Sequence, residues 1–185
     1  MDKIGVIHGR FQGLHLGHME YLLEGKKRCK HLIIGITNYE PYLNFEVNNP
    51  INLNRTKVES NPFSFFERYA MLQGSMREAG VNINSFNIVP FPIENPDNIF
   101  NFTPRDAVYY ITIYDQWGYE KEKILNEIGC KVEIMWIRDD SQRITSGTEI
   151  RNKIKNKSEW KQLVPKYVYN YIIDNEIDKR IRGEC

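Results

Sequence analysis

Two histidines near the start of the chain stand three residues apart, in a setting that suits them to bind a polyphosphate. The run from Gly9 to His18 reads GRFQGLHLGH, in which Arg10 adds a fixed positive charge. The apolar stretch Ile4–Ile7 precedes this run and is typical of a buried strand. His15 and His18 therefore fall where the next helix should begin, and their spacing places both rings on one face of that helix.

The start of a helix is itself a suitable place for an anion. Its first turn offers backbone N–H groups without intrahelical partners and carries a partial positive charge. Gly9 and Gly13 permit sharp backbone turns that residues with a Cβ resist. Two histidines at this spacing are, on their own, also typical of a polar surface. The strand, turn and helix around them favour nucleotide chemistry instead.

The run over residues 9–18 resembles the signature of the HxGH nucleotidyltransferase superfamily. This superfamily includes nicotinamide mononucleotide (NMN) adenylyltransferases, pantetheine-phosphate adenylyltransferases and small cytidylyltransferases. Residues 145–151, TSGTEIR, resemble its second motif, and residues 61–68 and 160–165 are similar to segments of archaeal-type NMN adenylyltransferases. The four segments follow the family's order and span nearly the whole chain.

The resemblance implies roles for the matching residues. His15, His18, Arg10 and Arg151 would be catalytic, acting on the triphosphate and its pentacovalent transition state. The nucleotide-binding residues implied are Gly9, Arg10, Phe11, Gln12, Gly17, His18, Thr145, Ser146, Thr148 and Arg151. Arg68 is implied as a phosphate ligand on the acceptor side of the cleft, and its alternative role is a solvated helix residue paired with Glu67 or Glu78.

The second motif also has a purely structural interpretation. Ser146 or Thr145 can cap a helix, and Glu149 completes a capping-box pattern with Ser146. Capping does not account for Arg151, because a basic residue in the first turn of a helix opposes the dipole. A polyphosphate between the helix end and the guanidinium would offset that repulsion.

The acceptor side departs from the archaeal pattern. Asp115 and Trp117 stand where archaeal NMN adenylyltransferases carry a Gly-Asn segment that lines the nicotinamide site. Both residues could bind an acceptor, by hydrogen bonding and stacking, although Trp117 could equally pack at a helix start. In addition, Gly13 replaces a proline found in many relatives. The connection over residues 38–60 is longer than the short one expected in archaeal NMN adenylyltransferases.

Strand-like and helix-like segments alternate along the chain. This pattern predicts an α/β fold, a Rossmann-like, doubly wound parallel sheet of five strands with helices on both faces and a C-terminal helical segment over 146–185. Ligands of such sheets bind beyond the carboxyl ends of the strands. The expected strands are 4–8, 31–37, 85–91, 107–113 and 131–137, and the expected helices are 16–29, 63–78 and 120–128.

Length and composition restrict the possible classes of protein. The 185 residues predict one nucleotidyltransferase domain over 1–185, with 38–60 as an active-site or lid loop. A net charge of +1 argues against a nucleic-acid partner. We expect no membrane segment or signal peptide, and a cytoplasmic location suits the scattered Cys29, Cys130 and Cys185. His8 and His31 are interpreted as structural residues with satisfied hydrogen bonds.

The function predicted first is transfer of AMP from ATP to nicotinamide or nicotinate mononucleotide, by direct in-line attack with release of pyrophosphate. The alternative is a cytidylyltransferase that activates a phosphorylated alcohol or a phosphonate with CTP, and a non-catalytic nucleotide sensor is a third hypothesis. We expect Mg²⁺ bound mainly through the triphosphate, no metal site made by the protein itself, and a possible homo-oligomer.

Overall fold

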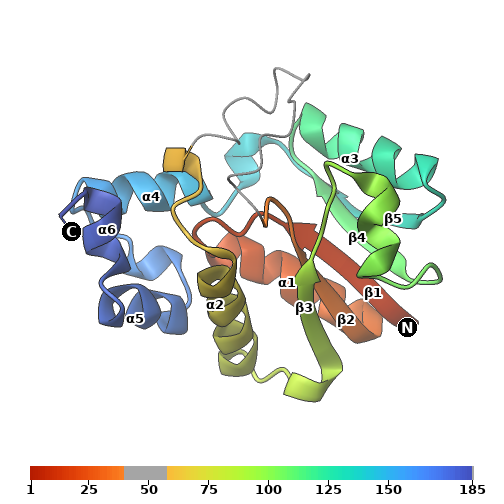
Figure 1. The fold of residues 1–185 in the computed structure, drawn as a ribbon, viewed down its shortest axis with the longest axis horizontal. Coiled ribbons are helices and arrows are strands. Elements are labelled where there is room, and N and C mark those ends of the chain that lie inside the picture. Colours follow the sequence, from red (N-terminus) through yellow and green to blue (C-terminus); the bar gives the residue numbers. More distant parts are fainter. Residues whose placement is uncertain (40–57, 185) are drawn as a thin grey trace.

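Five parallel strands form one sheet in the order β3-β2-β1-β4-β5 (Figure 1). The computed structural model describes residues 1–39 and 58–184. The strands are β1 (Asp2–Gly9), β2 (Cys29–Ile36), β3 (Phe86–Pro90), β4 (Val108–Ile113) and β5 (Lys131–Ile137). The predicted Rossmann-like α/β sheet is confirmed, and each strand end lies within two residues of its predicted position.

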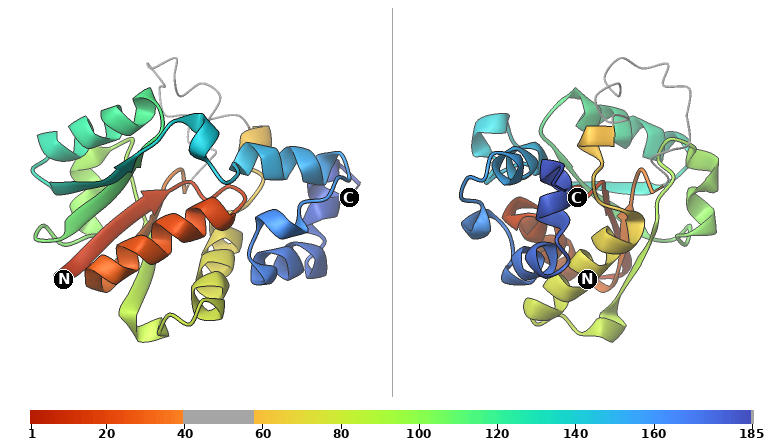
Figure 2. Two further views of the ribbon diagram at one scale, coloured as in Figure 1. Left: turned by 180° about the vertical axis from the view of Figure 1, so that it is seen from behind. Right: turned by 60° about the vertical axis from the view of Figure 1, so that its left-hand side comes forward.

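Helices cover both faces of the sheet. Side chains of α1 and α2 pack into one core cluster, and those of α3 pack into a second cluster on the other face. The last three helices gather beside α2 and the turn after β1 (Figures 1 and 2). The helices are α1 (Leu16–Arg28), α2 (Phe65–Glu78), α3 (Gln116–Glu127), α4 (Gly147–Lys155), α5 (Lys166–Asp174) and α6 (Ile177–Arg182).

Local capping sets where two of these helices begin. Ser64 and Glu67 form a complete capping box at the start of α2. Asp115 caps α3 by accepting from the Gly118 N–H, so this helix begins four residues before the predicted position. The apolar spacing over 120–128 did not reveal this first turn, because its signal is the cap rather than the periodicity.

The sheet order places β1 at its centre, where the chain reverses the direction in which it adds strands. From β1 the chain continues to β2 and β3, and it then crosses back to β4 on the other side of β1. Such a switch point, at the carboxyl ends of the strands, is where open parallel sheets bind ligands. The first motif follows β1 directly, and the second motif follows β5.

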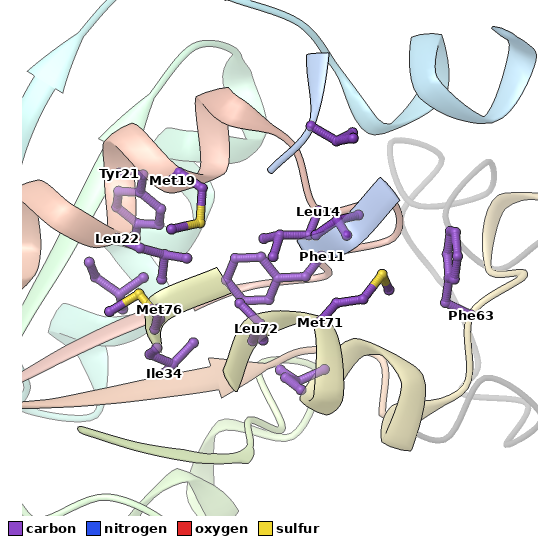
Figure 3. Close-up of a cluster of buried hydrophobic side chains, with 14 of the residues drawn as sticks. Phe11, Leu14, Met19, Tyr21, Leu22, Ile34, Phe63, Met71, Leu72 and Met76 are labelled. Atoms are coloured by element: carbon purple, nitrogen blue, oxygen red, sulfur yellow. The ribbon is translucent and has the colours of Figure 1, made fainter. Parts of the chain in front are cut away.

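The turn after β1 is anchored in the core. Phe11 and Leu14 are buried and lie beside side chains of α1 and α2, including Leu22 and Leu72 (Figure 3). Phe11 has a φ of 51°, so the turn bends sharply while its ring stays in the core. Packing therefore holds the position of the motif backbone.

Three further expectations concern the loop over 38–60, the cysteines and membrane-spanning segments. Of the loop predicted over 38–60, residues 40–57 lie outside the described residues, and so does Cys185. Cys29 and Cys130 are buried free thiols. No helix within residues 1–39 and 58–184 has the length and apolar character of a membrane span.

The approach of α4 to the turn after β1 predicts an effect of Gly147→Ala. A Cβ at residue 147 would lie 2.5 Å from the Gln12 carbonyl oxygen, so the backbone of α4 must move away. We expect a loss of about 1–3 kcal/mol in the free energy of unfolding, measured by urea denaturation. Asn152→Ala, on the exposed side of the same helix, should change it by less than about 0.5 kcal/mol. Equal stability of both variants would show that α4 does not approach the Gln12 carbonyl this closely.

Candidate active site

His15 and His18 lie against each other at the start of α1. Their ring centroids are 3.7 Å apart, and the rings are nearly parallel. His15 is the N-cap residue, and its Nδ1 accepts a hydrogen bond of 3.3 Å from the backbone N–H of His18. An imidazole nitrogen that accepts carries no proton, so the proton of neutral His15 is on Nε2, which is left as a donor.

Both imidazoles are neutral at pH 7. Burial, together with the charges of Arg143 and Arg151, lowers the pKa of His15 to about 4. The pKa of His18 is also well below its usual value, first through burial and then through His15, Arg10 and Arg143. Among the described residues, the positive charge that acts on these rings comes from Arg10, Arg143 and Arg151, and the histidines supply uncharged N–H donors.

Arg151 reaches the first motif from the other end of the chain. Its guanidinium donates from Nη1 to the Gln12 carbonyl oxygen at 2.7 Å and from Nη2 to Thr148 Oγ1 at 3.1 Å. The side chain is buried, which lowers its pKa without removing its charge at neutral pH. Gln12 and Arg151 are 139 residues apart in sequence, and their contact brings the two motifs together at one place.

The hydroxyl groups of the second motif have partners within it. Ser146 Oγ accepts from the Glu149 N–H at 3.1 Å and caps α4, as the structural interpretation predicts. The Glu149 carboxylate accepts from Thr145 Oγ1 at 2.8 Å. Thr148 accepts from Arg151, so it holds the guanidinium in the described structure.

Four residues of the first motif shape the backbone of the turn after β1 and the start of α1. The Gln12 amide forms two 3.0 Å hydrogen bonds with the backbone N–H and carbonyl of Phe63, before α2. The Phe11 ring meets the edge of His18 with centroids 5.1 Å apart. A Cβ at Gly9 would press on the Phe11 ring, and one at Gly17 would press on His15. These four positions therefore set the shape of the turn.

Arg68 is fully buried and bonds to backbone carbonyls. Its guanidinium donates to the carbonyl oxygens of Arg10, Thr37, Asn38 and Ser64, at 2.8 to 3.2 Å. Burial lowers its pKa to about 10, so it remains charged at pH 7. The alternative role as a solvated helix residue is wrong, because this side chain has no exposed surface. Its contacts join the turn after β1, the end of β2 and the start of α2.

Asp115 and Trp117 lie on the α3 side of the sheet. Asp115 is the exposed cap of α3, and its Oδ2 lies 3.4 Å from Nη2 of Arg143. The Arg143 guanidinium also lies 4.6 Å from the centroid of the Tyr114 ring. Trp117 packs in the second core cluster and is 9% exposed. Asp115 is thus connected through Arg143 to the charge around the histidines, whereas the Trp117 ring is largely in the core.

The sequence analysis did not predict the roles of three residues near the two motifs. Arg143 stands two residues before the second motif, and a basic residue so close to a helix start was the available signal. Gly147 was visible within the motif, but its close approach to Gln12 depends on the fold. His8 was expected to have satisfied hydrogen bonds, yet neither of its ring nitrogens has a partner among the described residues.

The donor set around the histidines does not suit a metal held by the protein alone. Within the described residues, no three His, Cys, Asp or Glu side chains gather in a way that could ligate an ion. The charged groups that act on His15 and His18 are arginines. This arrangement fits a divalent ion that arrives with a polyphosphate and is ligated by phosphate oxygens and water.

Comparison with known proteins identifies the family. The profile of the cytidylyltransferase-like family matches residues 6–182, nearly the whole chain. The chain belongs to this family. It is therefore a nucleotidyltransferase, and the predicted superfamily is confirmed.

Two curated relatives match almost the full chain. A phosphonoformate cytidylyltransferase of Streptomyces viridochromogenes is 44% identical over 97% of this chain and 95% of its own length. A nicotinamide-nucleotide adenylyltransferase of Saccharolobus solfataricus is 28% identical over 96% of this chain and 94% of its own length.

Solved structures support the fold. A bifunctional NMN adenylyltransferase/ADP-ribose pyrophosphatase of Francisella tularensis, complexed with AMP and a manganese ion, aligns with a TM-score of 0.68 and 20% identity. The alignment covers all of this chain and 53% of the bifunctional protein, so the cytidylyltransferase-like chain spans about half of that protein's length.

The contacts of Arg68 predict a large loss of stability in Arg68→Met. Removing the guanidinium leaves carbonyl groups, some of them buried, without their charged donor. We expect the free energy of unfolding to fall by about 3 kcal/mol or more, with a smaller fall for Arg68→Lys, which keeps the charge. Arg77→Met, at an exposed position of α2, is the matched control and should be nearly neutral. If Arg68→Met were as stable as this control, the proposed anchoring would be refuted.

The pKa of His15 predicts how stability depends on pH. In the unfolded chain His15 takes a proton near pH 6.5, but in the folded chain only near pH 4. Between these values the unfolded state binds more protons, so stability falls as pH decreases from 6.5 toward 4. His15→Asn retains a capping side chain and should show a shallower fall in urea denaturation between pH 4.5 and 7. Parallel curves for the two proteins would show that His15 titrates normally.

Proposed function

We propose that this protein transfers CMP from CTP to a small phosphonate, releasing pyrophosphate. The observation that carries the proposal is the 44% identity to a phosphonoformate cytidylyltransferase over 97% of this chain. The relatives that act on nicotinamide nucleotide reach 26% to 29% over similar lengths. This proposal corresponds to the alternative in the sequence analysis rather than to the adenylyltransferase predicted first.

In the proposed reaction, an oxygen of the phosphonate attacks the α-phosphorus of CTP. The new P–O bond forms as the bond from the α-phosphorus to the bridging oxygen breaks, and pyrophosphate leaves with that electron pair. The attacking oxygen is already deprotonated at neutral pH, so the step needs no general base. The task of the protein is to bring two anions together and to stabilise the charge on the phosphoryl oxygens.

The described residues suit this task. Arg10, Arg143 and Arg151 supply positive charge around the start of α1, which would draw the phosphates to the imidazoles. Nε2–H of His15 is the free donor of its ring. A divalent ion such as Mg²⁺, held by the phosphates and water, would neutralise part of the remaining charge.

Transfer of AMP from ATP to NMN is the second candidate. It is favoured by the similarity to nicotinamide-nucleotide adenylyltransferases over almost the full chain. Against it stands the segment over residues 112–118, which departs from the Gly-Asn segment of the archaeal pattern and whose Tyr114 and Asp115 contact Arg143.

Turnover with defined substrate pairs tests the proposal. Pyrophosphate release is measured with CTP or ATP against phosphonoformate or NMN. We expect release with CTP and phosphonoformate, and release with ATP and NMN alone would establish the second candidate instead. His18→Ala should lower kcat by about 10²–10³-fold, because it removes one donor to the transition state.

A matched control separates loss of catalysis from loss of folding. Lys123→Ala alters an exposed lysine of α3 that pairs with Glu127, and it should leave kcat unchanged. Circular dichroism should show the same helix content for both variants and the wild type. A His18→Ala variant with full turnover would remove this histidine from the proposed reaction.

A further inference from the structure

His8 is a buried histidine whose hydrogen bonds are not satisfied by the described residues. It is 3% exposed, and neither of its buried ring nitrogens has a hydrogen-bond partner within residues 1–39 and 58–184. His31 of the adjacent strand, which was given the same structural interpretation, has a partner: its Nε2 lies 2.7 Å from Asn87 Oδ1. The two histidines therefore differ, and only His31 fits the structural interpretation.

The surroundings of His8 would suit an apolar side chain. Its ring stacks on Phe91 with centroids 4.5 Å apart and an angle of 11° between the planes. Phe91 belongs to the core cluster that also contains Val6, Tyr109 and Trp117. Desolvating both nitrogens in such a place carries a penalty that no protein hydrogen bond recovers. A leucine at this position would avoid that penalty, so the imidazole calls for another explanation.

The position of His8 relates it to the proposed reaction. It lies near the carboxyl end of the central strand, directly before Gly9 and the first motif. Its ring is on the α3 side of the sheet, whereas neighbouring Ile7 packs into the cluster on the α1 side. An acceptor bound beside the motif at the switch point would therefore lie at the strand end that carries His8.

The protonation state of His8 favours a hydrogen-bond acceptor. Burial lowers its pKa well below the usual value, and the positive charge of Lys121 on α3 acts in the same direction. The ring is therefore neutral and has one N–H to donate. A buried donor suits a carboxylate or a second acid group, because charged acceptors form the stronger hydrogen bonds.

We propose that His8 recognises the acid group of the acceptor that is not cytidylylated, such as the carboxylate of phosphonoformate. The N–H of His8 donates to an oxygen of this group, while the phosphonate at the other end of the acceptor faces the triphosphate. The inference rests on the proposed function and makes His8 a residue that determines acceptor specificity.

The test compares two acceptors in His8→Leu. Phosphonoformate carries the second acid group, and methylphosphonate lacks it. With CTP saturating, we expect the KM of His8→Leu for phosphonoformate to rise about 10–100-fold, the loss typical of one hydrogen bond to a charged group. The KM for methylphosphonate and the Kd of CTP should change less than twofold. His8→Asn, which keeps a donor, should recover part of the affinity for phosphonoformate.

Stability separates recognition from a structural role. Because His8→Leu removes unpaired polar atoms from the core, its melting temperature should equal or exceed that of the wild type. His31→Leu, in the neighbouring strand at the amino end of the sheet, is the matched control for acceptor kinetics and should leave both KM values unchanged. A lowered melting temperature of His8→Leu with equal effects on both acceptors would overturn the inference.

A binding measurement keeps the two proposals distinguishable. The ¹⁵N signals of the His8 ring, assigned by their loss in His8→Leu, should move when phosphonoformate is added with CTP and should move less with methylphosphonate. If the wild type transfers CMP to neither acceptor, the proposed function is wrong. If it transfers CMP but the His8 signals and the KM ratio stay fixed, the role of His8 is wrong.

Discussion

The hydrogen bond from the His18 backbone to Nδ1 of His15 determines what the site can do. It completes the start of α1, and at the same time it fixes the position of the proton on the neutral ring. Protonating Nδ1 would break the cap, and burial together with nearby arginines opposes that step. The free protein therefore presents an uncharged N–H donor in a defined direction. A bound polyphosphate, being negative, would shift this balance toward the charged ring.

The cations of the site also hold the backbone that positions the histidines. Arg68 and Arg151 both donate to carbonyl oxygens of the turn after β1, at Arg10 and Gln12. The Gln12 amide binds the same turn to Phe63. Because these bonds join protein groups to one another, they hold the turn in position and preorganise the donors that phosphoryl transfer requires.

The sequence alone was sufficient to predict the features that depend on residues close together along the chain. Alternating apolar runs identified all five strands, and the Ser146 cap and the positions of His15 and His18 followed from short spacings. It was insufficient to predict contacts between residues that are far apart in the sequence. The four carbonyls around Arg68 belong to three separate segments, and the empty hydrogen-bonding positions of His8 depend on how β3 and α3 cover the central strand. No local pattern carries that information.

The arrangement of the sheet explains why the nucleotide half was easier to predict than the acceptor half. The two motifs meet through backbone contacts such as that of Arg151 with Gln12, which restrict the residue types that fit. The α3 side instead presents side chains such as His8, whose ring nitrogens bond to no part of the turn within residues 1–39 and 58–184. If His8 binds the acceptor as proposed, residues on this face rather than the motifs would distinguish one member of the cytidylyltransferase-like family from another.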